Sequence, residues 1–214
     1  MRVAAALKSE INLMMNSPIT NEDLRRELLR MQAEDQEARA ELAADGSLFD
    51  GYHPRMEAAH RRNAARLTRI IAAHGWPVRE LVGEDGAEAA WMIAQHAISE
   101  PEFQRRCLIL LLEAAERGAI PFWQVAFLED RIRLFEGRQQ LYGTQYDWDE
   151  RGEMSPQPIE DEEHVDERRH AIGLIPLAEN TTRMRAGMEE APPRDWRERQ
   201  REFEDWARKT GWRK

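Results

Sequence analysis

The apolar residues of this chain recur at steps of four and three, and this spacing constrains the fold more than any other feature. Residues spaced in this way lie on one face of an α-helix. The first such stripe consists of Leu24, Leu28, Met31, Asp35, Ala38 and Leu42. No stretch sustains the alternation of β-branched and polar residues that is typical of a strand, so no strand is expected. The sequence therefore predicts an all-α protein.

Start and stop signals divide residues 20–146 into about five main helices. A capping side chain at Thr20 or Asn21 begins the first helix, and Gly75 ends the second. A turn at residues 83–86 precedes the third helix, while Pro101 and Pro121 open the fourth and the fifth. Because the connections are short, we predict an antiparallel bundle with a partly irregular C-terminal extension.

The composition divides the chain into four parts. Residues 1–19 are an N-terminal lead-in, for which a short helix is one alternative. Residues 20–146 form the core of the bundle. The acidic segment 147–180 is expected to pack back on that core. Residues 181–214 contain a Pro-rich linker and a Trp-rich amphipathic helix.

The charge of the chain excludes one broad class of function. The formal net charge is −9, whereas a general nucleic-acid binder needs clustered basic residues. The single cysteine, Cys107, lies in an apolar run and is expected to be a core residue of a cytoplasmic protein. We expect no signal peptide and no membrane span, because no apolar run is long enough.

Four polar residues stand at positions where the helical period predicts apolar ones. They are Asp35, Asn63, His96 and Asp130. In a bundle these faces share one interior, so the four side chains are expected to converge. A carboxylate beside His96 would set its tautomer and its basicity. We therefore predict an enzyme with His96 as acid or base and with Asp35 and Asp130 as orienting or proton-accepting groups.

A polar loop follows the fifth helix and adds candidate ligand contacts. The segment EGRQQLYGTQYDW, residues 136–148, is interpreted as a lid over the polar interior, or alternatively as a plug whose amides satisfy buried backbone. The expected substrate contacts are Arg39, Asn63, Gln95, Tyr142 and Gln145. An arginine with amides and a tyrosine suits a small polar ligand that carries a carboxylate or resembles a peptide.

A metal site and a cofactor are not expected. Glu57 and His60 have the Glu-x-x-His spacing of di-iron bundles, but those need a second such motif on a core stripe. A mononuclear site made of His60, His74 and His96 is left open. His53, His60 and His74 are expected at the surface or at helix ends.

A noncatalytic role is the competing hypothesis. A buried polar network also fixes the register of a bundle without chemistry. In that case the Trp-rich tail or the acidic segment would bind a protein partner.

The sequence resembles a bacterial family that is known only as a domain of unknown function. The matching motifs, within residues 22–180, are Asp35-Gln36-x-x-Arg39, Asn63 with Arg66-Leu67, Gly75-Trp76-Pro77, Val82-Gly83, Ala89-Ala90-Trp91, Gln95-His96-Ala97, Pro101-Glu102-Phe103-Gln104, Asp130-Arg131, Gln140-x-Tyr142-Gly143-Thr144-Gln145 and Val165-Asp166-x-Arg168-Arg169 with Gly173-Leu174. The resemblance implies a shared helical fold and no particular reaction. The family commonly has acidic residues at the positions of His60 and Ile98. Because this chain lacks them, any role of an acidic residue at those two positions is weakened.

Overall fold

The fold was determined as a computed structural model that describes residues 19–49, 51–187, 192–193 and 195–214. The predicted lead-in falls almost entirely outside these residues. The helices are α2 (Glu22–Ala44), α3 (Pro54–His74), α4 (Arg79–His96), α5 (Pro101–Glu116), α6 (Phe122–Phe135), α7 (Val165–Ala171), α8 (Leu177–Ala186) and α9 (Trp196–Lys209). The described residues also include two 3-10 turns, Ser47–Phe49 and Glu162–His164. The prediction of an all-α protein is confirmed.

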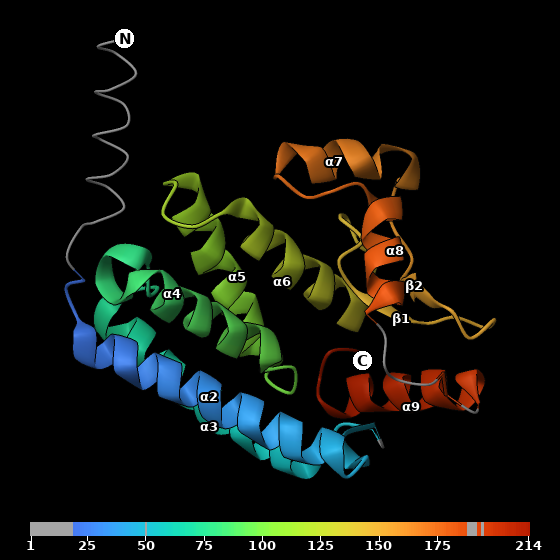
Figure 1. Ribbon diagram of the computed structural model, residues 1–214, viewed down its shortest axis with the longest axis horizontal. Coiled ribbons are helices and arrows are strands. Elements are labelled where there is room, and N and C mark those ends of the chain that lie inside the picture. Colours follow the sequence, from blue (N-terminus) through green and yellow to red (C-terminus); the bar gives the residue numbers. More distant parts are fainter. Residues whose placement is uncertain (1–18, 50, 188–191, 194) are drawn as a thin grey trace.

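Helices α2 to α6 form the bundle and contain most of the core. The six residues of the predicted first stripe are the buried residues of α2, including the polar Asp35. Asn21 is the N-cap and accepts a hydrogen bond from the Leu24 N–H, which confirms the predicted start. Helices α2 and α3 lie side by side, and α4 packs against both of them (Figure 1). The expected turn before the third helix is a kink inside α4 at Gly83, where φ is 75°.

The expectation of no strand is wrong. Two three-residue strands, β1 (Tyr146–Trp148) and β2 (Met154–Pro156), pair in an antiparallel hairpin. Strands of this length are too short to show a period in the sequence. Hydrogen bonds to the Asp149 carboxylate from the N–H groups of Arg151 and Glu153 hold the turn.

The C-terminal helix α9 packs on the bundle beside the hairpin (Figure 1). Trp206 and Trp212 each lie with their ring centroid 5.2 Å from that of Phe135. The Trp212 indole also donates a hydrogen bond of 2.7 Å to the Ile98 carbonyl, which follows α4. Trp212 is therefore a core residue, and Phe203 and Trp206 pack against the same core. Among the described residues, no helix has the length and apolarity that crossing a membrane requires.

Candidate functional site

The candidate site is built around the Asp35 carboxylate, which α2 places inside the bundle. The residue is 3% exposed. His60 approaches it from α3 and His96 from the last turn of α4. We call these three residues the Asp35 cluster.

The two histidines contact different oxygens of the carboxylate. His96 Nδ1 lies 2.6 Å from Asp35 Oδ2 in a hydrogen bond. His60 Nε2 lies 2.7 Å from Asp35 Oδ1, but without the alignment of a hydrogen bond, so neither atom has a hydrogen-bond partner among the described residues. The two imidazole centroids are 5.4 Å apart. One carboxylate thus stands between two rings from two other helices.

The environment of Asp35 favours its charged form. Burial by itself raises the pKa of this carboxyl, but the contacts with His60 and His96 outweigh it and hold the pKa well below its usual range. An ionised carboxylate inside the bundle is therefore expected at neutral pH. The charge of this carboxylate can stabilise a protonated imidazole or bind a cation.

Tyr52 holds His60 from the side opposite the carboxylate. Its hydroxyl lies 2.7 Å from His60 Nδ1, and the two rings stack with centroids 5.8 Å apart. Burial raises the pKa of Tyr52, so the phenol stays protonated. The edge of Trp206, in α9, contacts the same tyrosine at 6.1 Å between ring centroids. Helix α9 therefore packs against the tyrosine that contacts His60.

The Asp35 cluster also has the composition of a metal site. Each of the three residues offers one ligand atom, and these atoms lie within 4.8 Å of one another. Asp35 and His60 are buried, whereas the His96 side chain is 28% exposed. Cys107 does not join them, since it lies in the core and burial raises its pKa to about 12.

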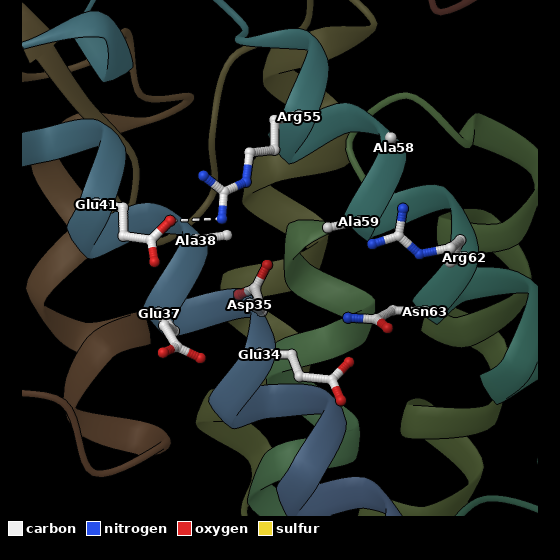
Figure 2. Close-up of a pocket in the computed structure, with 10 residues that line it drawn as sticks. All are labelled: Glu34, Asp35, Glu37, Ala38, Glu41, Arg55, Ala58, Ala59, Arg62 and Asn63. Carbon is white, nitrogen blue, oxygen red and sulfur yellow. Dashed lines mark ion pairs between the residues drawn. The ribbon is translucent and has the colours of Figure 1, made fainter. Parts of the chain in front are cut away.

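A groove of about 370 Å³ reaches Asp35 from the surface between α2 and α3. Figure 2 shows Asp35 in the middle of this groove, with Asn63 pointing toward it from α3. The α2 wall carries acids and the α3 wall carries arginines. The lining residues are Glu34, Asp35, Glu37, Ala38, Glu41, Arg55, Ala58, Ala59, Arg62 and Asn63. Of the predicted substrate contacts, Asn63 lies in the groove.

Two other predicted contacts, one on α2 and one on α4, lie outside the groove. Arg39 is exposed on α2. Gln95 is 3% exposed, and both polar atoms of its side chain lack a hydrogen-bond partner among the described residues. Its backbone carbonyl accepts a hydrogen bond of 2.5 Å from Arg131. Gln95 thus lies directly before His96 but is turned into the protein.

Asp130 lies in a second, separate network. It is fully buried, and its carboxylate accepts hydrogen bonds from the N–H groups of Leu141, Tyr142 and Thr144 and from the Thr144 hydroxyl. Arg169 donates to the Tyr142 carbonyl at 2.6 Å, and Arg168 donates to the Leu141 carbonyl at 2.7 Å. We call Asp130, Arg168, Arg169 and the loop of residues 140–145 the Asp130 clamp.

The Asp130 clamp binds both the N–H groups and the carbonyl groups of the loop backbone. Gln140, also fully buried, donates to the carbonyls of Gln145 and Gln157. Gln145 accepts from Arg131, a half-buried residue whose pKa burial lowers to about 10. Among the described residues, no hydrogen bond joins this loop to the Asp35 cluster. These contacts favour the interpretation of the loop as a plug rather than as a lid.

The structure brings together two of the three expected catalytic residues, Asp35 and His96. It adds Tyr52, which was not predicted, and His60, which was considered only for a metal site with His74 and His96. The expectation of a surface position for His60 is wrong, since the residue is 7% exposed. Its signal was present, because His60 follows Met56 by four residues and precedes Leu67 by seven on the buried face of α3. Tyr52 lies in a loop and carried no periodic signal. Glu57 pairs with Arg61 at 2.9 Å instead of with the cluster, so the Glu-x-x-His spacing does not mark a di-iron site.

Comparisons with curated proteins and with solved structures find no match. A family model does match the chain over residues 22–189, which includes the Asp35 cluster, the groove and the Asp130 clamp. The chain therefore belongs to DUF6624, a family of unknown function.

Proposed function

We propose that the Asp35 cluster is the reaction centre of an enzyme that acts on a small polar or peptide-like ligand. The observation that carries the proposal is the contact of 2.6 Å between His96 Nδ1 and the buried Asp35 carboxylate. A carboxylate at this nitrogen fixes the tautomer of the ring and leaves the other nitrogen to take or give a proton. His96 is partly exposed and so open to a ligand, and Asp35 connects it to the groove, whose lining residues do not include His96.

The groove between α2 and α3 supports the choice of ligand. Glu37 stands on its acidic wall and Arg62 on its basic wall, and neither forms an ion pair among the residues that the structure describes. Glu41 and Arg55 are paired with each other at 2.5 Å. A ligand with an ammonium group and a carboxylate, such as a short peptide, would complement Glu37 and Arg62. The amide of Asn63, whose Nδ2 also donates to the Met31 carbonyl at 3.4 Å, adds hydrogen-bonding groups to the same groove.

Turnover of a ligand panel tests the proposal. Purified protein would be incubated with amino acids and dipeptides, and consumption of each would be followed by mass spectrometry. We expect at least one compound to be consumed, and His96→Gln to slow its consumption by about 100-fold or more, as loss of an acid–base group does. His74→Gln changes an exposed histidine at the end of α3 and should leave the rate unaltered.

Two results would contradict the proposal. One is a rate that His96→Gln does not change in a folded protein. The other is a compound that binds with equal affinity to the wild type and to His96→Gln without being consumed. The second result would indicate a noncatalytic binding module, in which the polar network only fixes the bundle.

A further inference from the structure

We propose that Asp35, His60 and His96 bind one divalent transition-metal ion of the zinc(II) or iron(II) class. The inference rests on the proposed function in that the same three residues form the reaction centre. It assigns them a different role, because the imidazoles become metal ligands and a metal-bound water replaces His96 as the proton donor or acceptor.

The first support is the pair of unsatisfied atoms at the centre of the cluster. Asp35 Oδ1 and His60 Nε2 are buried and 2.7 Å apart, yet they form no hydrogen bond with each other. Burying polar atoms without a hydrogen-bond partner is costly. A cation between them removes this cost.

The second support is the hydrogen bond on the far side of His60. Its Nδ1 lies 2.7 Å from the Tyr52 hydroxyl. A histidine ligand commonly donates its other ring N–H to an oxygen, and this fixes the tautomer that points a lone pair at the metal. With Nδ1–H donated to Tyr52, the lone pair of Nε2 faces Asp35.

The third support is the spacing of the ligand atoms. A tetrahedral ion with bonds of about 2.1 Å places its ligand atoms about 3.4 Å apart. The present contacts to Asp35 are 2.6 and 2.7 Å, and all three ligand atoms lie within 4.8 Å of one another. The two contacts to Asp35 would lengthen by about 0.8 Å, and the largest separation among the ligand atoms would shorten by at most about 1.4 Å.

The ligand set also indicates the kind of ion and its use. Imidazole nitrogens suit zinc, iron, copper and nickel, whereas magnesium and calcium prefer oxygen ligands. Three protein ligands leave at least one coordination position open, as in catalytic rather than structural zinc sites. The exposed part of His96 places that position within reach of solvent.

Metal titration of the intact chain tests the inference. Protein stripped with a chelator and then freed of it would be titrated with Zn²⁺, and separately with Mg²⁺, by isothermal calorimetry. We expect one equivalent of Zn²⁺ with a dissociation constant in the micromolar range or tighter, and no binding of Mg²⁺. Replacing either histidine ligand, as in His60→Ala or His96→Ala, should weaken Zn²⁺ binding at least 100-fold, while His74→Ala should leave it unaltered.

A second variant tests the supporting tyrosine without touching a ligand. Tyr52→Phe removes the hydroxyl partner of His60 and should weaken Zn²⁺ binding about tenfold. Tyr146→Phe makes the same chemical change in the hairpin, where the hydroxyl contacts Thr181 and Asn180, and should have no effect. Circular dichroism of each variant verifies that it is folded.

Absence of binding by Zn²⁺, Co²⁺ and anaerobic Fe²⁺ would overturn the inference, as would Zn²⁺ binding that survives both histidine substitutions. An intense visible spectrum of the Co²⁺ form, lost in His60→Ala, would support it, because such bands mark a tetrahedral or five-coordinate site. If no metal binds but turnover still depends on His96, the metal inference fails and the proposed function stands. If metal binds and no compound in the panel is consumed, the proposed function fails instead.

Discussion

Two buried aspartates stand on apolar stripes of this bundle, and their surroundings differ in kind. The Asp130 carboxylate receives hydrogen bonds from three backbone N–H groups and one hydroxyl. Asp35 instead faces two imidazoles, and one of its oxygens lacks a hydrogen-bond partner among the described residues. One carboxylate is saturated by its own chain, while the other retains capacity to bind.

This difference separates a structural polar residue from a candidate functional one. A carboxylate whose acceptor capacity is filled by backbone donors fixes a loop and has little left for a ligand. A carboxylate between groups that themselves bind protons and metals can change partners without unfolding the chain. Burial alone does not distinguish the two, since both residues are almost fully buried.

The largest expected effect on stability comes from replacing Asp130, whose carboxylate accepts hydrogen bonds from three N–H groups and one hydroxyl. Asp130→Asn sets an amide N–H₂ against N–H donors of the loop, so some of those hydrogen bonds are lost with both groups buried. We expect a loss of about 3 kcal/mol, which is about 6 to 12 °C in melting temperature for a chain of this size. Thermal denaturation measures it, with Asp205→Asn on the exposed face of α9 as the control. A loss below about 1 kcal/mol would mean that the Asp130 clamp is not the anchor of the loop.

A smaller effect is expected from the tight turn of the same loop. Gly143 has φ of 64°, and a Cβ there would lie 2.7 Å from Ile159 Cδ1 and 2.8 Å from Leu177 Cδ1. Gly143→Ala should cost about 1 to 2 kcal/mol for the backbone conformation and more for the displaced side chains.

Gly118→Ala is the matched control for this substitution. Gly118 has φ of 70°, but nothing lies within 4 Å of its Cβ position, so only the backbone cost applies. The difference between the two melting temperatures measures how closely the loop packs on Ile159 and Leu177. Equal losses would contradict close packing of the loop.

The smallest effect on stability is expected at Asp35. Asp35→Asn keeps a side chain of the same shape, and each imidazole has a tautomer that can pair with an amide. We expect a change in stability of less than about 1 kcal/mol, or a gain, because functional groups are often held at some cost to stability. Thermal denaturation beside Asp130→Asn makes the comparison direct. A loss as large as that of Asp130→Asn would show that the Asp35 cluster is structural.

Most of the bundle could be predicted from local signals. The stripe of α2, the cap at Asn21, and the prolines that open α5 and α6 all stand where the sequence analysis placed them. The hairpin was missed because strands of three residues show no period. The kink at Gly83 was read as a longer turn, since a Gly-acid-acid-Gly run resembles one and only the backbone shows that the helix resumes.

The candidate site was predictable only in part. Asp35 and His96 were identified because a charge or an imidazole on an apolar stripe is costly unless it has a partner. His60 was expected at the surface or at a helix end, although its spacing from Met56 and Leu67 places it on the buried face of α3. Tyr52 could not be found at all, because its role depends on a loop that returns to α3.

The sequence by itself determined which helix faces are buried, where most helices begin and end, and that two aspartates lie inside. These properties follow from residue spacing and capping along a single helix. Only the tertiary structure decided which aspartate meets the histidines and which one meets the loop. That choice depends on the relative rotation and depth of packed helices, which local sequence does not encode.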